Sequence, residues 1–579
     1  MSNMQCELNT RRFWLYLACS LCLTQLLACG GSSGASTAKQ LTVASTNPAA
    51  DATSVNTTTT VSAVFSATLE PGAGNTSSVA LTSVVGDEAI KVASDRNNIL
   101  ITPIRQLSFL TKYVLRLGES LVGSAGEVFA GSSTSFTTRD GAWGDPTILR
   151  STGRAEPQAA IDETGHYILV WPEAQAGGTS GIAAARYNSN SEELSKWVVG
   201  KSISGQNTVF PKIVMDGSGN ALAAWTSVGA GETVTASIWA ARYDVTANAW
   251  GEPKLVTGDV INPSSPTGVK GEVQLARNAK GNAMLLWQSN SKKAYNYALF
   301  DPFASSWSAP ASVPSNTLTA LPTSAWLSMN ASGNAILAYV QQDGVGSPQI
   351  FTSLYSFATN IWSAKPTMLK RDGYSASVQP TIQVKLDLQG NATVIWDYFV
   401  DMSTVGLAAN RYTAATGSWS EPVVLSNSLP QEQASQPSMD ADNTGNVHVT
   451  WVQSTSKGSA LKSRVYQAPE GKWNDKVIQY NAKDGVDDFN RIDIVQQLAV
   501  DPAGNAIVLW VDNCAMVASR YSKPANTRSD TRRVGYMNGL TCTFTRLQVV
   551  VNQRGQALTI WKQPDSEGID YFINSNFFR

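Results

Sequence analysis

The chain has 579 residues, and its 43 Lys and Arg residues nearly balance 44 Asp and Glu residues, giving a formal net charge of −1. Proteins that bind nucleic acid neutralise phosphates with clustered basic residues, so this balance excludes nucleic acid as a partner. The composition includes only two histidines, His166 and His448. We therefore predict no metal site, no Ser-His-Asp catalytic set and no cofactor.

The amino terminus, residues 1–28, has the features of an export signal. Arg11 and Arg12 precede an apolar run from Phe13 to Leu27 that is too short to span a membrane. An ordinary secretory signal, cut at a small residue, is one interpretation of this segment.

The end of that run, Leu26-Leu27-Ala28-Cys29, resembles the lipobox of bacterial lipoproteins. The resemblance implies cleavage before Cys29, whose thiol carries lipid, and Gly30 implies sorting to the outer membrane of a Gram-negative cell. Residues 29–40 begin with a Gly- and Ser-rich stretch that suits a flexible linker. We expect a protein held to the membrane by this lipid and facing the periplasm or the cell surface.

Two cysteines remain once the export signal and the lipidated residue are set aside. Of the six cysteines, three lie in residues 1–28 and one is Cys29, which leaves Cys514 and Cys542. An even pair in an oxidising compartment favours a disulfide, and two separate buried thiols are the alternative.

Residues 41–140 alternate apolar and polar residues in short runs, as in Val61–Phe65 and Tyr113–Leu117. Period-two runs separated by turn residues predict a β-sandwich. The order Asn47-Pro48, Ile101-Thr102-Pro103 and Phe136-Thr137-Thr138 resembles the bacterial Ig-like domain of surface-layer proteins. That resemblance implies a spacer or adhesion module without catalytic residues.

The remaining residues, 141–579, repeat one phrase eight times: Asp or Asn, a Gly three or more positions on, and an apolar run ending in Trp or Tyr. The copies run over Asp162–Trp171, Asp216–Trp225, Asn278–Trp287, Asn330–Tyr339, Asp387–Trp396, Asp440–Trp451, Asp501–Trp510 and Asn552–Trp561. Their glycines lie 51 to 62 residues apart. A period of this length is typical of solenoids, propellers and arrays.

Each unit is expected to hold four strands, which the second copy places at 211–215, 220–225, 238–243 and 250–256. The Asp-x-x-Gly segment predicts a tight hairpin, in which the carboxylate accepts backbone N–H groups and glycine takes a positive φ. Small residues such as Ala183-Ala184-Ala185 suit middle strands of sheets that converge on an axis. The fold class is therefore all-β, with an Ig-like sandwich followed by an eight-bladed β-propeller.

A second tryptophan series marks the outermost strand of each unit, and its first member, Trp143, precedes the first turn. The last unit ends at Phe577-Phe578 without a fourth strand. A strand around Trp143 is therefore expected to complete the last blade and leave no long unpaired edge. Seven blades plus a stray hairpin, or a split array, are the alternatives, because the seventh unit lacks this Trp.

Two motifs are weighed against known patterns. Sialidase-type propellers carry a Ser-x-Asp-x-Gly-x-x-Trp box, but Gly219 and Trp225 are separated by too many residues and the serine is absent. Asp440-Ala-Asp442-Asn-Thr-Gly445 begins like a calcium loop and lacks the later bidentate acid, so a hairpin with an inserted residue is favoured.

Polar residues that follow the middle-strand Trp are expected on the ligand-facing rim. The binding candidates are Glu173, Asp397, Tyr398, Asp401 and Asp512. We predict a membrane-anchored binding or scaffolding protein whose ligand is a carbohydrate or an envelope protein, more consistent with a non-enzyme. The alternatives are a glycan-cleaving hydrolase that uses a carboxylate pair such as Asp397 and Asp401, and a structural subunit of an envelope assembly.

Overall fold

The structure is a computed structural model of the chain. It describes residues 39–579 apart from 73–76, 152–155, 176–178, 190, 192, 201–205, 230–235, 261–272, 290, 293, 317, 319–321, 343–347, 370–379, 402, 427–429, 457, 476, 481–491, 513–514, 537–546 and 565–570. Within this part of the chain the only helical element is the 3-10 turn η1 (Ala468–Glu470). No helix among the described residues is long and apolar enough to cross a membrane.

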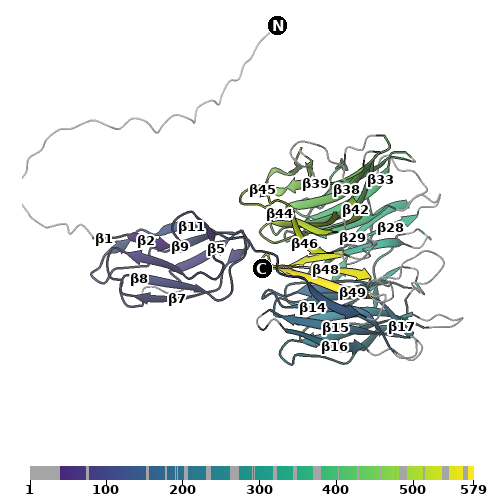
Figure 1. The fold of residues 1–579 in the computed structure, drawn as a ribbon, viewed down its shortest axis with the longest axis horizontal. Helices are drawn as coiled ribbons and strands as arrows, with labels where there is room; N and C mark the ends of the chain where they lie inside the picture. Colours follow the sequence, from purple (N-terminus) through teal and green to yellow (C-terminus); the bar gives the residue numbers. More distant parts are fainter. Residues whose placement is uncertain are drawn as a thin grey trace, which may run out of the picture.

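The amino-terminal domain is a sandwich of two sheets, which confirms the predicted Ig-like fold (Figure 1). One sheet has the order β2 (Val43–Asn47), β4 (Val61–Phe65), β8 (Asn98–Pro103), β7 (Ile90–Asp95); the other has the order β3 (Ala52–Val55), β11 (Ser132–Thr138), β9 (Lys112–Leu117), β5 (Val79–Ser83), β6 (Gly86–Asp87). β1 (Gln40–Leu41) pairs with β10 (Val128–Phe129). Burial alternates along β4 and β9, so inward side chains such as Phe65 and Tyr113 form the core.

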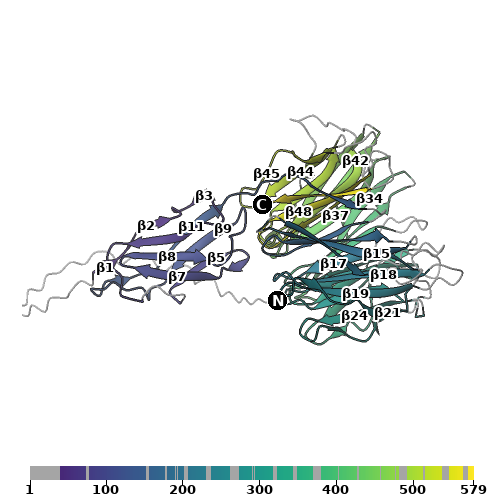
Figure 2. The ribbon, with the colours of Figure 1, turned by 60° about the horizontal axis from the view of Figure 1, so that its bottom comes forward.

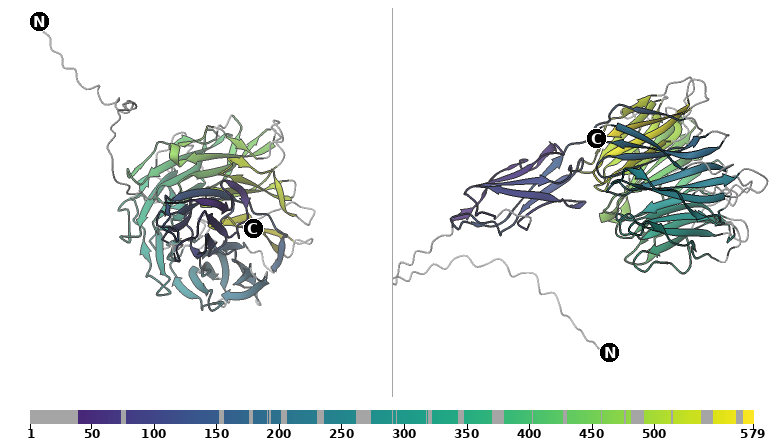
Figure 3. Two further views of the ribbon diagram at one scale, coloured as in Figure 1. Left: turned by 90° about the vertical axis from the view of Figure 1, so that its left-hand side faces the viewer. Right: turned by 90° about the horizontal axis from the view of Figure 1, so that it is seen from below.

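The second domain is a series of antiparallel meanders arranged around an axis, seen end-on in the left panel of Figure 3. We number these meanders as repeats 1 to 8 in chain order and call their strands A to D from the axis outward. The strands of the first four repeats are β13 (Gln158–Ile161), β14 (Tyr167–Ala174), β15 (Ser180–Asn188), β16 (Glu193–Gly200); β17 (Gln206–Met215), β18 (Ala221–Gly229), β19 (Ala236–Asp244), β20 (Ala249–Trp250), β21 (Lys254–Thr257); β22 (Gln274–Arg277), β23 (Ala283–Gln288), β24 (Tyr295–Asp301), β25 (Ser306–Trp307), β26 (Ala311–Ser312); and β27 (Thr323–Met329), β28 (Ala335–Gln342), β29 (Pro348–Ser356), β30 (Ile361–Trp362), β31 (Thr367–Met368).

The strands of repeats 5 to 8 are β32 (Ile382–Leu386), β33 (Ala392–Phe399), β34 (Val405–Thr413), β35 (Ser418–Trp419), β36 (Val423–Val424); β37 (Gln433–Ala441), β38 (Val447–Thr455), β39 (Gly458–Gln467), β40 (Lys472–Trp473), β41 (Ile478–Gln479); β42 (Ile492–Val500), β43 (Ala506–Asp512), β44 (Ala515–Ser522), β45 (Thr527–Arg528), β46 (Arg532–Tyr536); and β47 (Leu547–Val551), β48 (Ala557–Pro564), β49 (Tyr571–Phe578). A single parallel bridge between Val405 and Gln433 joins repeats 5 and 6 into one sheet. The D strand of repeats 2 to 7 is split in two, and in repeat 2 the break falls at the Gly-Glu-Pro segment that follows Trp250, where Pro253 has no N–H to pair.

The repeated hairpins between strands A and B have the predicted chemistry. The Asp216 carboxylate, for example, accepts the backbone N–H groups of Ser218 and Asn220 at 3.0 and 2.9 Å. The eight repeat glycines have φ between 78° and 95°, the region that favours glycine. The asparagine after the glycine has its own role, because Asn220 Oδ1 accepts the N–H of Val245 and so ties this turn to the turn between strands C and D.

The sixth copy of the turn starts at Asp442, and the prediction that it starts at Asp440 was wrong. Asp442 Oδ1 accepts the N–H groups of Thr444 and Asn446, both at 2.9 Å. The phrase Asp442-Asn-Thr-Gly445-Asn446 therefore has the same spacing as the other copies, and no residue is inserted. Asp440 is the penultimate residue of strand A, β37.

The first strand of the second domain closes the ring, as the surplus strand around Trp143 predicted. β12 (Thr147–Ser151) pairs antiparallel with β49, from Thr147 opposite Ser575 to Ser151 opposite Tyr571. Trp143 forms a bridge with Phe578, and the two ring centroids lie 5.2 Å apart. The carboxyl-terminal meander thus gains its fourth strand from residues that precede repeat 1.

The Ig-like domain lies against one end of the second domain, beside the carboxyl terminus (Figures 1 and 2). Phe109 donates its backbone N–H to Arg554 O at 2.9 Å, and Arg554 forms an ion pair with Glu88 at 2.6 Å. Arg554 belongs to the A–B turn of repeat 8, and the A–B turn of repeat 1 also contacts the domain through the Glu163–Arg105 ion pair. Because B–C loops leave the opposite ends of the strands, they face away from the Ig-like domain.

Candidate functional site

The candidate rim site is built around the B–C hairpin of repeat 5, which connects β33 to β34. Asp397, near the end of β33, accepts the N–H of Thr381 at 2.6 Å. Burial raises the pKa of the Asp397 carboxyl, and the hydrogen bond from Thr381 only partly opposes that shift. This carboxyl is therefore easier to protonate than an ordinary aspartate.

Two further predicted residues lie on the same hairpin. Asp401 accepts the Ser403 N–H at 2.7 Å and the Ser403 and Thr404 hydroxyls at 2.8 and 3.0 Å. These donors, the Ser403 N–H above all, hold the pKa of the exposed Asp401 carboxyl below its usual value. Tyr398 lies opposite Gly406 in the hairpin, and its ring occupies the space that a side chain at position 406 would need.

Repeat 6 adds polar groups beside this hairpin. Gln431 donates its N–H to the Thr404 hydroxyl at 3.0 Å, and Val405 donates its N–H to Glu432 O at 3.0 Å. The Glu432 carboxylate lies 3.5 Å from Gln453 Nε2. Glu432 is not among the residues predicted for the rim, because Glu432 precedes strand A and does not follow the middle-strand Trp. It comes to the rim only through the pairing of repeats 5 and 6.

The other two binding candidates lie on different repeats. Glu173, in repeat 1, accepts the indole N–H of Trp171 and lies 3.0 Å from Lys196 Nζ. Its carboxylate therefore satisfies the buried indole of its own strand. Asp512 ends β43 in repeat 7, opposite Ala515. The five candidates therefore come from three different repeats at the B–C end of the strands.

Three predicted modification sites cannot be placed. Cys29, Cys514 and Cys542 lie outside the described residues. The lipid anchor and the disulfide therefore stay predictions.

The histidines and the calcium-like turn lie at the A–B end of the strands, away from the rim. His166 follows the first turn, with its Nε2 2.9 Å from Asn188 Oδ1, and His448 is buried at the start of β38. Lys523 Nζ lies 2.7 Å from Asp442 Oδ2, and Lys385 Nζ lies 2.5 Å from Asp440 Oδ1. Lysine ammonium groups thus neutralise both carboxylates of the sixth turn segment.

These features define an all-β chain with an Ig-like domain and a propeller-like body. Residues 37–138 match the family described as bacterial Ig-like domain. No curated protein matches the chain.

Three solved structures are similar to this chain at low sequence identity. The Dos1 propeller is 8% identical with a TM-score of 0.43, covering 76% of this chain and 94% of that one. The polysaccharide lyase Uly1 is 10% identical with a TM-score of 0.40, covering 62% and 88%. A point mutant of NanB sialidase from Streptococcus pneumoniae is 9% identical with a TM-score of 0.34, covering 71% and 89%. The activities in these names describe those proteins alone.

Proposed function

We propose that this chain is a membrane-anchored extracytoplasmic protein that binds a carbohydrate or an envelope protein at the B–C rim of its propeller. The observation that carries the proposal is the position of the Ig-like domain, which is fixed to the A–B turns through Phe109 and Arg554. With the amino-terminal anchor on the Ig-like side, the B–C loops point away from the attachment point. That face is therefore free to meet a ligand.

The chemistry of the repeat 5 hairpin suits such a ligand. Tyr398 offers an aromatic surface with a polar hydroxyl, and Asp397, Asp401 and Glu432 offer carboxylate acceptors. An aromatic face beside hydrogen-bonding groups matches sugar rings and polar protein surfaces alike. Rigid strands on either side hold these groups in place.

The test is capture of glycans and envelope proteins by the purified full chain, followed by single alanine substitutions. Asp397→Ala, Tyr398→Ala and Asp512→Ala are expected to weaken capture while the melting temperature stays close to that of the parent. Asp216→Ala, which removes a turn carboxylate, is the matched control and is expected to lower stability and leave capture intact. Rim variants that bind as tightly as the parent would overturn the proposal.

A glycan-cleaving hydrolase is the second candidate, favoured by one specific observation. Asp397 and Asp401 lie on one hairpin, and their pKa values are shifted in opposite directions, upward by burial and downward by hydrogen bonds. Two carboxyls on one hairpin, one easier and one harder to protonate than usual, suit the roles of a general acid and of a base or nucleophile. Turnover of a glycan with a bell-shaped pH profile, abolished in Asp397→Asn, supports this function over simple binding.

The membrane attachment is tested separately. Cys29→Ala is expected to release the protein from the membrane fraction and to abolish incorporation of labelled fatty acid. Unchanged labelling refutes the lipid anchor and has no bearing on ligand binding at the B–C rim. Co-purification with a fixed set of envelope proteins, independent of the rim residues, supports a structural subunit instead.

A further inference from the structure

The innermost strands carry a ring of equivalent residues that the rim site does not use. In every repeat, one residue of strand A pairs with the strand B residue directly before the Trp or Tyr. This strand A residue lies four positions before the Asp or Asn that starts the turn. These residues are Gln158, Lys212, Gln274, Trp326, Gln383, Ser438, Gln497 and Gln548. We call this set the axial ring. Five of its eight members are glutamines.

Five members of the axial ring line a cavity on the axis. The cavity has a volume of about 630 Å³, and all eight repeats contribute residues to its wall. Small-molecule sites in proteins typically measure about 300–1,000 Å³. Turn residues such as Asp162 and Gln553 also line it, so it lies toward the A–B end, beside the Ig-like domain.

Two glutamines of the axial ring are held in fixed orientations. Gln383 Nε2 donates to Pro437 O at 2.6 Å, and its Oε1 accepts the Met439 N–H at 2.9 Å. Gln548 Oε1 accepts the Ala159 N–H at 2.9 Å, across the junction of repeats 8 and 1. A primary amide has two N–H donors and two acceptor lone pairs, so each keeps capacity for a ligand.

Trp326 is the exception in the axial ring. Its side chain is 41% exposed, whereas the middle-strand Trp residues of the repeats are buried. An indole left open inside a polar-walled cavity is an apolar surface available to a ligand. Lys385 and Asp440, paired with each other, and Arg277 complete the polar wall.

We propose that the axial cavity binds the terminal unit of a saccharide, with one sugar ring stacked on Trp326 and its hydroxyls bonded to the glutamine amides. The C–H face of a pyranose ring is apolar and flat enough to pack on indole, and its rim of hydroxyls both donates and accepts. The glutamine amides donate and accept in the same way. This site is distinct from the B–C rim, because its wall is formed by strand A residues and A–B turn residues.

The test is calorimetric titration of the full-length protein with neutral oligosaccharides and with their uronic-acid counterparts. Trp326→Ala is expected to weaken binding roughly tenfold or more, since stacking on the indole is lost. Trp326→Phe is expected to recover much of the affinity. Gln497→Leu, which removes one amide from the wall, is expected to weaken binding while the melting temperature is unchanged.

Two matched controls separate this site from general effects. Phe303→Ala removes an aromatic side chain that is 92% exposed and lies outside the cavity, and it is expected to leave binding unchanged. Ile361→Ala, in the same repeat as Trp326, removes a side chain that is 64% exposed and lies outside the cavity, and it is likewise expected to leave binding unchanged. If substitution of Arg277 or Lys385 weakens the binding of the uronic-acid oligosaccharides but not of the neutral ones, the occupant of the cavity is an acidic sugar. The proposal is overturned if no saccharide binds, or if Trp326→Ala binds as tightly as the parent.

Discussion

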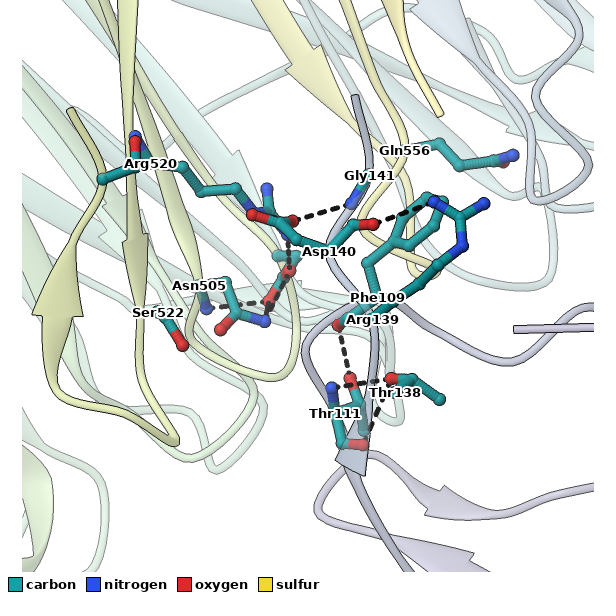
Figure 4. A network of polar contacts seen from close by, with 12 residues as sticks. Phe109, Thr111, Thr138, Arg139, Asp140, Gly141, Asn505, Arg520, Ser522 and Gln556 are labelled. Atoms are coloured by element: carbon teal, nitrogen blue, oxygen red, sulfur yellow. Dashed lines mark hydrogen bonds and ion pairs between the residues drawn. The ribbon is translucent and has the colours of Figure 1, made fainter. Parts of the chain in front are cut away.

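The guanidinium of Arg520 and the carboxylate of Asp140 join the two domains, with Nε 2.8 Å from Oδ1 (Figure 4). Asp140 lies two residues after the end of β11, the last strand of the Ig-like domain, and Arg520 lies on β44 of repeat 7. The same guanidinium is 3.3 Å from Asp501 Oδ2, in the turn of repeat 7, and 4.8 Å from the centroid of the Phe578 ring. The Arg520 guanidinium therefore contacts the domain junction through Asp140, the turn of repeat 7 through Asp501 and the carboxyl-terminal strand through Phe578.

Replacing Arg520 with Met is expected to destabilise the protein strongly. The Asp501 side chain is 2% exposed, and burial already raises the pKa of its carboxyl. Removal of the cation leaves a buried charge without its partner, which costs about 3–5 kcal/mol. Asp140→Asn is the matched control, and because the Asp140 side chain is 38% exposed the expected cost is about 1 kcal/mol or less. Urea denaturation at pH 7 measures both, and equal losses would contradict the assignment.

Phe109→Ala is expected to weaken the domain junction and the propeller together. Phe109 is fully buried in a cluster from repeats 7 and 8, and its ring centroid lies 6.0 Å from that of Phe578. Truncating a buried Phe costs about 3–5 kcal/mol. Thermal melting is expected to show a lower propeller transition, and small-angle scattering a broader range of domain orientations.

Phe65→Ala is the control for that prediction. Phe65 is buried in the core of the Ig-like domain and does not belong to the junction cluster. It is expected to lower only the Ig-like transition. A propeller transition that shifts equally in both variants contradicts a specific role for Phe109.

Local chemistry explains which parts of the fold could be predicted from sequence. The Asp-x-x-Gly hairpin depends on a carboxylate and a positive φ within four residues, so its form is evident without tertiary context. The closing strand could be predicted because a surplus strand at one end matched a missing one at the other. The register of the sixth turn was misread because Asp440 and Asp442 both precede the glycine.

The docking of Phe109 and the axial ring required the assembled structure. Ser108, beside Phe109, donates its hydroxyl to Gln553 O, a contact across 445 positions of sequence. Period-two alternation places Gln383 and Gln548 on one face of their strands but does not say which face meets the axis. The Gln four residues before the turn is a recurring signal that becomes meaningful only once the strands surround a cavity.

The rim was predicted only in part for a related reason. Residues after the middle-strand Trp do lie at the B–C end, yet Glu173 accepts the indole N–H of Trp171. A polar residue two positions after a buried Trp serves that indole in repeat 6 as well, where Gln453 accepts from Trp451 at 3.0 Å. Sequence alone does not separate such a structural contact from a ligand contact.

His448 is expected to make stability fall at acidic pH. Burial lowers the pKa of His448 from 6.5 to about 4, although Asp442 and Asp440 raise it and Lys523 lowers it further. Between these values the unfolded chain binds a proton that the folded chain does not, so stability decreases as pH falls from 6.5 to 4. The pKa difference corresponds to a loss on the order of 3 kcal/mol. Urea denaturation over this range is expected to show a shallower pH dependence in His448→Gln, and an unchanged slope contradicts the role of His448.

The closing strand is the last feature to test, because β12 and Trp143 supply the fourth strand of the carboxyl-terminal meander from the other end of the domain. Trp143→Ala removes a partly buried ring that packs on Phe578, a member of the same cluster as Phe109. Its loss is expected to cost about 2–3 kcal/mol, below the range of about 3–5 kcal/mol for a fully buried Trp. Ile148→Ala, in the same segment, is the control, because its side chain is 57% exposed and surface changes usually stay within about 0.5 kcal/mol.

A chain beginning at Gly141 keeps β12 and is expected to fold, whereas one beginning after Arg154 leaves β49 as an open edge and is expected to aggregate or melt far lower. Equal melting temperatures for these two chains would show that the pairing of β12 with β49 does not hold the ring closed.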